Sequence, residues 1–484
     1  MFGFMRKRHR DDERWTARRE LEAAGLLPDE TVRGGIVLGE CRERKGAPRL
    51  VRHLGAEHVL VVAPCRSGKT AGITVPTLLT WEDSVVVFDV KGETHGITRD
   101  FRERHLGQRV LRFEPGAADS ARFNPLREIQ CAHDLVKEAR HLCALLVNPD
   151  QREVDHWTSA AIGLLTAIVL FVCLYEDSVG EITEASLATV LAILTDGGPL
   201  HAAHAQQPMK VAETSSVSTA FYIIREVAAY FRDRYAATGI AEHATDLAAW
   251  KAVEEIMGGW LERPHQEAAS IIAVARQALA FLADPVVAAS TRESDFSIES
   301  LMSGGQNTSL YITGSPFNYP RHQVLAKVVV DMVIRRRLGV LVGKKAEGRL
   351  LLLIDDLGVF GRLPALAEGL ARFGGCAMTA VLVAQSRGQI SQMYWETEAE
   401  SIVANCALLV AHTPSSLETA EFFAARSALS AADIMGISQH EELLLVPGRT
   451  AFRCGKVEYY RDERFRARAN GGPGELRAQR QGRG

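Results

Sequence analysis

The sequence predicts an α/β protein: a mostly parallel central sheet flanked by helices, with an all-α domain inserted between two parts of that sheet. Short apolar runs rich in Val, Leu and Ile occur early and late in the chain, separated by stretches with helical spacing. Such continuous runs are typical of strands that helices bury on both faces. Between about residues 130 and 290 the runs disappear, and Ala, Leu and Glu recur at helical spacing. That contrast predicts the helical insertion.

The first strong strands are HVLVVA at 58–63 and SVVVFDV at 84–90, and a shorter one, GIVLGE, precedes them. Between the two strong strands lie a loop and a helical stretch, in which Pro76 is expected to cap or kink the helix. This order of strand, loop, helix and strand opens a parallel α/β domain. The other expected strands occupy residues 109–115, 308–314, 349–358, 378–386, 405–412, 441–447 and 455–461.

Composition divides the chain into five segments. Residues 1–50 form a charged N-terminal segment with a short helix and a strand. The sheet domain is expected in two parts, at 51–177 and 286–465, on either side of an all-α domain at 178–285. The Gly- and Arg-rich tail, 466–484, is expected to be disordered.

The overall composition is that of a soluble globular protein, with 47% apolar and 24% charged residues. The formal net charge is −3, so any DNA contact is expected from a local surface. The eight cysteines include no C-x-x-C pair, and the 15 histidines include no H-x-x-x-H pair. A zinc site or a disulfide framework is therefore not expected, and a reducing compartment is.

The most apolar stretch is AAIGLLTAIVLFVCLY at 160–175. It is shorter than the roughly 20 residues that cross a bilayer as a helix, so we predict a buried core helix. Neither a transmembrane region nor a secretory signal is visible. The Met1–Arg10 segment is expected to be a solvated, disordered terminus. The alternative is a contact with an anionic membrane through Phe2, Phe4 and the basic residues.

The segment APCRSGKT resembles the phosphate-binding pattern G-x-x-x-x-G-K-[ST], with Ala63 in place of the first glycine. Backbone N–H groups around Gly68 and the following helix N-terminus favour an anion. Lys69 is expected to bridge the β and γ phosphates of ATP, and the Thr70 hydroxyl to bind Mg²⁺. The alternative is a chance exposed turn. The residues expected to enclose the phosphates are Ala63, Pro64, Cys65, Arg66, Ser67, Gly68, Lys69 and Thr70.

Two carboxylates end the apolar run LLLIDD, where the metal-side carboxylate of such nucleotide-binding proteins is expected. Asp355 is predicted to hold Mg²⁺ through its water shell, and Asp356 to orient or deprotonate the attacking water. The alternative is that both simply end a strand in a turn.

Two further polar groups follow expected strands. Gln385 ends AVLVAQ and is predicted to sense the γ phosphate or the attacking water, unless it caps the next helix. In FDVKGE, Asp89, Lys91 and Glu93 form either a solvated turn or a contact near the nucleotide or a subunit interface.

With these motifs in this order, the sequence resembles the TraG-like type IV secretion coupling proteins, which are ATPases of the RecA/FtsK-like P-loop class that serve conjugation. The resemblance covers most of the chain. Its phrases are RRELEAAGLL, GIVLGE, HVLVVAPCRSGKTAGITVPTLL, SVVVFDVKGE, RVLRFEP, RFNPL, DHW, FLADPVVAASTRESDFSIESLM, LLLIDDLGVFGRLPAL, VLVAQS, IVANC, LETAE, LLLVPGR and YYRDERFRAR.

The resemblance implies a RecA-like nucleotide-binding domain with an inserted all-α domain. It also implies a homo-hexameric ring at the inner membrane with ATP at the subunit interfaces, and an all-α domain that recognises the substrate or its relaxase. Arg372, about one helix past Asp355, is a candidate arginine finger for a neighbouring copy, with a solvated helix arginine as the alternative.

The sequence departs from the family pattern in four places. The usual transmembrane region is not visible. The family's R-S-G-K-G is Arg66-Ser67-Gly68-Lys69-Thr70 here, the usual Asp-Glu pair is Asp355-Asp356, and DEFP is replaced by DDLG. The aspartate shortens the reach of the expected base by about 1.5 Å.

The leading hypothesis is a DNA or protein translocation motor that hydrolyses ATP·Mg²⁺ and feeds single-stranded DNA, or a relaxase or other protein substrate, to type IV secretion channel components. We expect it in the cytoplasm, peripheral at the cytoplasmic face of the inner membrane. Membrane attachment then needs a separate anchor partner or the N-terminal segment, or is absent. One alternative is a weakly hydrolysing, nucleotide-binding substrate receptor. Another is a soluble DNA translocase or helicase.

Overall fold

The structure of the protein is a computed structural model that describes residues 18–29, 31–42, 47–150, 153–179, 184–201, 215–240, 243–302, 305–314, 319–339 and 348–469. The predictions for Met1–Arg10 and for the tail beyond residue 469 fall outside these residues. The chain forms two compact units. The sheet unit comprises Met1–Arg112, Glu299–Pro316 and Val333–Gly484, and the helical unit comprises Phe113–Ile298 and Phe317–Met332.

The sheet unit is built on an 11-stranded sheet with the order β2-β1-β11-β10-β9-β3-β8-β7-β4-β6-β5. The pairs from β9 through β3, β8, β7 and β4 to β6 are parallel. The β2-β1-β11-β10-β9 side is antiparallel. The strands are β1 Ile36–Cys41, β2 Arg49–His53, β3 Val59–Val62, β4 Ser84–Phe88, β5 Arg109–Phe113, β6 Thr308–Ile312, β7 Leu350–Ile354, β8 Met378–Ala384, β9 Leu408–Ala411, β10 Glu441–Leu445 and β11 Phe452–Gly455.

The central strands are buried at every position, as their continuous apolar runs predict. In register, Val62 pairs with Ala384 and Ile354 pairs with Leu382. The carboxyl ends of β3, β7 and β8 therefore meet at one edge. The residues that follow these strands, from Ala63, Asp355 and Gln385 onward, emerge together there.

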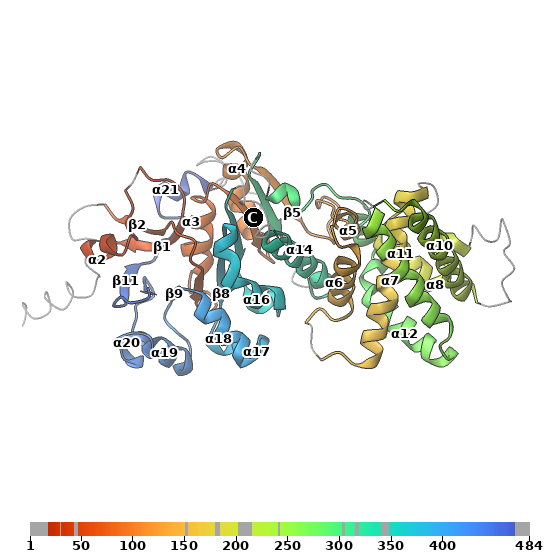
Figure 1. The fold of residues 1–484 in the computed structure, drawn as a ribbon. Helices are drawn as coiled ribbons and strands as arrows, with labels where there is room; N and C mark the ends of the chain where they lie inside the picture. The colour runs from red at the N-terminus through yellow and green to blue at the C-terminus, as the bar shows by residue number, and fades with distance from the viewer. Residues whose placement is uncertain are drawn as a thin grey trace, which may run out of the picture. The chain divides into compact units, whose positions relative to one another are not determined.

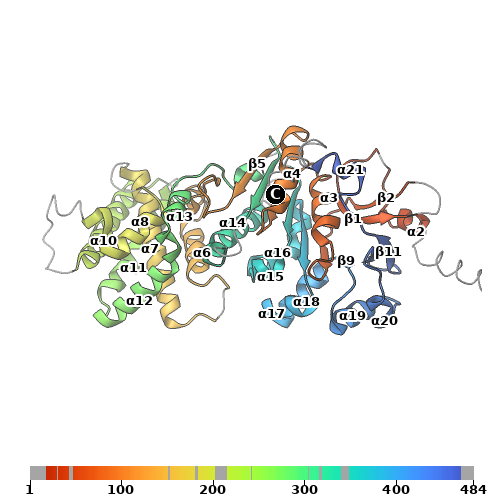
Figure 2. The same ribbon diagram turned by 180° about the vertical axis from the view of Figure 1, so that it is seen from behind.

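Helices flank this sheet. Figures 1 and 2 both show α2 beside β1 and β2, and α17 beside α18. The helices of the sheet unit are α2 Arg18–Ala23, η1 Thr70–Thr74, α3 Val75–Leu78, α4 Glu93–Arg104, η4 Glu299–Leu301, α15 Leu357–Phe360, α16 Pro364–Phe373, η6 Gly374–Cys376, α17 Arg387–Met393, α18 Glu396–Asn405, α19 Leu417–Ala424, α20 Ala431–Met435 and α21 Glu463–Arg466. Helix α14, Tyr319–Gly339, continues from one unit into the other.

The expected strand at 455–461 is wrong. The last strand is β11, and the residues after Gly455 leave the ladder and turn before α21. Lys456 and Val457 are nevertheless buried, because this segment packs against other elements rather than pairing with a strand. Strand β2 was not expected, since RLVRH is short and carries two charges that mask its apolar alternation.

The helical unit packs around α7, which contacts α6, α11 and α12. Its aromatic core places Trp250 against Phe231, with ring centroids 4.9 Å apart, and Phe171 edge-on to Trp250. The helices are α5 Pro125–Gln130, α6 Leu135–Val147, α7 His156–Val179, α8 Leu187–Asp196, α10 Ser216–Thr238, α11 Ala244–Leu261, α12 His265–Ala278, η3 Ala280–Ala283 and α13 Pro285–Ser290.

The compact helical unit is larger than the expected insertion at 178–285. It begins at Phe113, so residues 113–177, expected in the sheet domain, pack with the helices instead. The sequence pattern shows that α5, α6 and α7 are helical. The pattern does not show whether their apolar faces pack in the sheet unit or in the helical unit.

Helix α7 also bears on the membrane question. Among the described residues it is the one helix apolar and long enough to cross a bilayer, with a mean hydropathy of 2.2 over His156–Glu176. Of that window, 72% is buried within the protein. The helix has 24 residues because polar residues extend the apolar stretch at both ends. This burial agrees with the predicted core helix.

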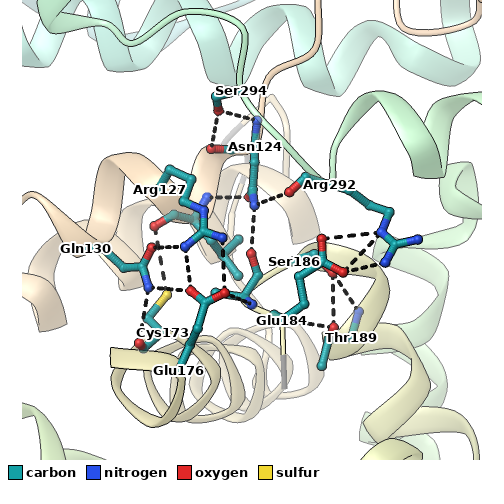
Figure 3. Close-up of polar contacts among 12 residues, drawn as sticks. Asn124, Arg127, Gln130, Cys173, Glu176, Glu184, Ser186, Thr189, Arg292 and Ser294 are labelled. Atoms are coloured by element: carbon teal, nitrogen blue, oxygen red, sulfur yellow. Dashed lines mark hydrogen bonds and ion pairs between the residues drawn. The ribbon is translucent and has the colours of Figure 1, made fainter. Parts of the chain in front are cut away.

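A polar network joins the ends of several helices in this unit (Figure 3). The Asn124 side chain accepts a hydrogen bond from Leu126 N, which caps α5, and donates to the carbonyls of Ala185 and Arg292 at 2.7 and 2.8 Å. Arg127 pairs with Glu176 of α7. Asn124 of the RFNPL phrase therefore ties the start of α5 to the chain segments before α8 and after α13, and Arg127 ties α5 to α7.

Candidate nucleotide-binding site

The loop between β3 and η1 explains how Ala63 replaces the expected glycine. Ala63 is buried, and its N–H donates to Ala384 O at 2.9 Å, so the residue continues the β3–β8 ladder in extended form. The turn starts only afterwards, where Ser67 N donates to Pro64 O at 3.3 Å. Gly68 has φ +87°, a left-handed conformation that favours glycine. Glycine is thus required at position 68, and alanine is tolerated at 63.

The helix after the loop begins with a wide turn. Lys69 already has helical dihedrals, Gly72 N donates to Gly68 O at 2.8 Å, and η1 is a π-helical turn. Pro76 is the second residue of α3, which continues directly from η1, so its missing N–H lies where the π-helical turn passes into the α-helix. The N-terminus of this helical segment follows Gly68 and Lys69 directly.

Thr70 and Asp355 lie in contact. Thr70 Oγ1 donates to Asp355 Oδ2 at 2.8 Å, and Thr74 Oγ1 donates to Asp355 Oδ1. Burial raises the pKa of Asp355 to about 6, although the hydrogen bonds from the two threonines lower it. The structure thus brings together the hydroxyl and the carboxylate that the sequence assigned to Mg²⁺.

These residues fit a magnesium site of the kind completed by substrate. Mg²⁺ prefers oxygen ligands and usually keeps several waters, with one or two protein groups plus phosphate oxygens. The described residues contain no cluster of three or more His, Cys, Asp or Glu side chains that could hold a metal. A partly buried carboxylate between two hydroxyls is nonetheless a fitting partner for a cation that arrives with a nucleotide.

Asp356 and Gln385 also lie together. Gln385 Nε2 donates to Asp356 Oδ2 at 3.3 Å, and Cys65 Sγ lies 3.1 Å from Gln385 Oε1. The cap of α17 is Ser386, which accepts a hydrogen bond from Gln389 N, so Gln385 is not the helix cap. Asp356 is itself the N-cap of α15 and accepts from Val359 N at 3.3 Å.

Asp89 has a structural role in the FDVKGE turn, because it accepts hydrogen bonds from Thr94 N and Thr94 Oγ1 at 2.7 and 2.6 Å. Lys91 and Glu93 are exposed. The structure does not bring Arg372 to the site of its own chain. Arg372 is exposed near the end of α16, before β8 begins, whereas Gln385 follows the end of β8.

The sequence reasoning assigned no role to His412, Glu442 and Lys456, although all three are buried and cluster at Ser67 of the loop. One signal was available for His412, which directly follows the strand NCALLVAH at the same edge as Gln385. No pattern in the sequence indicates that Glu442 and Lys456 join it.

The mostly parallel sheet with a phosphate-type loop at its carboxyl edge defines a RecA-like α/β fold. The chain belongs to the family described as "Type IV secretory system Conjugative DNA transfer", which matches residues 14–427. It is 32% identical over 430 residues to the conjugal transfer protein TraG of Escherichia coli, covering 84% of this chain and 62% of that protein. It is 22% identical to the protein VirD4 of Agrobacterium fabrum, covering 96% of this chain and 68% of VirD4.

Solved structures share the fold. The bacterial conjugative coupling protein TrwBdeltaN70, in complex with sulphate, has a TM-score of 0.61 at 18% identity and covers 93% of this chain and 96% of that one. The plasmid coupling protein TrwB in complex with ADP and Mg²⁺ has the same TM-score at 17% identity, with 92% and 93% coverage. The chain spans about 62% of the length of the TraG relative.

Proposed function

We propose that the protein binds and hydrolyses ATP with Mg²⁺ and that this activity recruits conjugative DNA, or a protein–DNA complex, and drives it toward a type IV secretion channel. The observation that carries this proposal is the 2.8 Å contact between Thr70 and Asp355 directly beyond Gly68 and Lys69. Membership of the DNA-transfer family supports the substrate class. The TrwB complex with ADP and Mg²⁺, on the same fold, supports the ligands.

The residues of the site have different chemical roles in this proposal. The N–H groups around Gly68 and the Lys69 ammonium bind the phosphates. Thr70 and Asp355 hold Mg²⁺, which supplies charge neutralisation at the phosphoryl oxygens. Asp356 accepts the proton of the attacking water. Gln385, 3.3 Å from that carboxylate, orients the water.

The assembly follows from the same proposal. In a homo-hexamer, the exposed Arg372 of one copy would reach the nucleotide site of a neighbouring copy, since it lies away from the site of its own chain. Single-stranded DNA would be held by its phosphates with little sequence readout. The protein would act at the cytoplasmic face of the inner membrane, together with a relaxase and the channel components.

Two features of Asp356 favour a second function, a nucleotide-binding receptor that hydrolyses ATP weakly. Asp356 already accepts the N–H of Val359 as a helix cap, and its side chain is one methylene shorter than the glutamate of the family pattern. Both features reduce its reach toward a water molecule.

Steady-state ATP hydrolysis, measured with and without single-stranded DNA, separates the two functions. Lys69→Ala should abolish nucleotide binding and turnover. Asp356→Asn keeps a good helix cap, so it should bind nucleotide normally and lose DNA-stimulated turnover. Lys251→Ala removes a lysine from an exposed position of α11 and serves as the matched control.

Turnover that DNA stimulates and that both substitutions abolish would establish the motor. Binding that depends on Lys69, without turnover above that of Asp356→Asn, would establish the receptor. If wild type and Lys69→Ala bind nucleotide equally well, both functions are wrong.

A further inference from the structure

Three buried polar side chains lie behind the phosphate loop, and none of them has a part in the chemistry above. His412 follows β9, Glu442 belongs to β10, and Lys456 follows β11. The His412 and Glu442 side chains are 0% and 1% exposed, and Lys456 is 6% exposed. We call these residues the loop-backing triad.

The sheet register explains why residues so far apart in sequence meet. Strand β10 runs antiparallel to β9 and to β11, with Leu443 opposite Ala411 and Glu441 opposite Gly455. The start of β10 therefore lies beside the residues that follow β9 and β11. Strand β9 in turn pairs with β3, which leads into the loop.

Two members of the triad, His412 and Lys456, contact Ser67. The Nδ1 atom of His412 is 3.1 Å from both the carbonyl and the hydroxyl oxygen of Ser67, and Lys456 Nζ donates to the same carbonyl at 3.1 Å. On its other side, His412 Nε2 is 3.1 Å from Glu442 Oε2. Ser67 immediately precedes Gly68 and Lys69, so its position fixes where the phosphate-binding groups point.

The neighbouring residue shows why such a clamp is needed. Arg66 has φ +59°, a left-handed conformation that carries a steric cost for residues with a Cβ atom. Strained conformations of this kind persist only where the surroundings hold them, and they concentrate at functional sites. Two hydrogen bonds to the next residue provide that restraint.

Burial shifts the pKa values of His412 and Glu442. Burial and the charge of Lys456 lower the pKa of His412 to about 3, so its imidazole is neutral. Burial raises the pKa of Glu442, against the opposing effect of Lys456. Because the His412 ring has no exposed surface, it does not contact a substrate.

We propose that the loop-backing triad consists of positioning residues that hold the phosphate loop in its anion-binding conformation against the strain at Arg66. This inference rests on the proposed nucleotide binding. It adds a coupling between the antiparallel β9–β11 side of the sheet and the phosphate loop.

The test measures the affinity for ADP·Mg²⁺ by titration calorimetry together with thermal unfolding. Lys456→Met keeps the aliphatic stem and removes the donor to Ser67. We expect the Kd to rise about tenfold, the loss expected for one charged hydrogen bond. Lys327→Met is the matched control, because Lys327 is an equally buried lysine, paired with Asp150 in the helical unit. It should leave the Kd of the folded protein unchanged.

A double-mutant cycle separates positioning from general damage. Arg66→Gly removes the steric strain, so Lys456→Met should raise the Kd less in the Arg66→Gly background than in wild type. A merely structural lysine, or one that touches phosphate, predicts the same loss in both backgrounds, which would overturn the proposal. A Kd within about twofold of wild type in folded Lys456→Met would also overturn it.

If Lys456→Met does not fold, His412→Phe decides, because it keeps a planar ring and removes the polar contacts to Ser67. The same rise in Kd and the same cycle are expected. Wild type and Lys69→Ala are measured alongside. Absence of binding by wild type refutes the proposed nucleotide binding itself, whereas Lys69-dependent binding that is indifferent to the triad refutes only this inference.

Discussion

Asp355 in the sheet unit and Glu176 in the helical unit are both partly buried carboxylates, but their pKa values move in opposite directions. Burial raises the pKa of Asp355 to about 6, since its hydrogen-bond donors are hydroxyls. Burial also acts on Glu176, but hydrogen bonds from Arg127, Gln130 and Ala185 N outweigh it and lower the pKa.

The difference separates a carboxylate that is paired with a cation of its own chain from the carboxylate to which we assign Mg²⁺. Glu176 carries its own cation, so its negative charge is compensated as soon as the chain folds. Among the described residues, the donors to Asp355 are the two threonine hydroxyls, and in the proposed site Mg²⁺ would supply the compensating charge. The predictions below test this contrast with the same chemical change, carboxylate to amide, at the two positions.

The largest effect is expected on nucleotide binding. Asp355→Asn should weaken the affinity for ADP·Mg²⁺ roughly 100-fold, because the buried anionic oxygen near Thr70 is lost. Titration calorimetry with and without Mg²⁺ measures it. Glu176→Gln is the control and should leave the affinity unchanged. Equal affinities for Asp355→Asn and wild type would place the metal elsewhere.

The second effect is on the stability of the nucleotide-free protein as a function of pH. The folded pKa of Asp355, about 6, exceeds the ordinary aspartate pKa of 3.8. The stabilisation from its protonated form is therefore complete below pH 4 and is lost as the pH rises through 6. Asp355→Asn should accordingly raise the free energy of unfolding at pH 8 by up to roughly 3 kcal/mol and change it little at pH 4.

The contribution of Glu176 to stability should depend on pH in the opposite direction. Its pKa is lowered in the folded protein, so its contribution is present above its unfolded pKa and is lost as the pH falls through the folded value. Glu176→Gln should lower the free energy of unfolding by about 1–2 kcal/mol at pH 7, and by less in acid. Chemical denaturation at several pH values measures both variants. If the two substitutions changed the free energy of unfolding in the same direction at every pH, the contrast between Asp355 and Glu176 would be contradicted.

The smallest effect is expected at Ala63. Because Ala63 continues a strand and does not adopt a positive φ, glycine at this position gains nothing and costs about 0.5–1 kcal/mol of stability. The affinity of Ala63→Gly for ADP·Mg²⁺ should stay within about twofold of wild type. A tenfold gain in affinity would show instead that alanine impairs the loop.

Local sequence predicted much of this site. Continuous apolar runs predict β3, β7 and β8 because a strand buried on both faces has no polar position. The loop and the carboxylates follow these strands directly, so Thr70, Asp355 and Gln385 were expected at one edge. The structure shows that this edge is shared, with Thr70 bonded to Asp355 and Gln385 bonded to Asp356.

Other features could not be read from local pattern. The strand expected at 455–461 is replaced by a buried segment without a ladder, and residues 113–177 pack in the helical unit. Periodicity indicates that a face is apolar, but the partner of that face is chosen by the whole chain. The loop-backing triad could not be predicted for the same reason. Its members become neighbours only because β10 pairs antiparallel with β9 and β11.

The sequence by itself therefore determined the chemistry available to this protein: a glycine, a lysine and a threonine in a loop, and carboxylates at a strand end. Only the tertiary structure decided which of these groups share an environment. Sheet order and burial place hydroxyls around Asp355 and a guanidinium beside Glu176, because long-range pairing sets the dielectric surroundings and the partners that fix each charge.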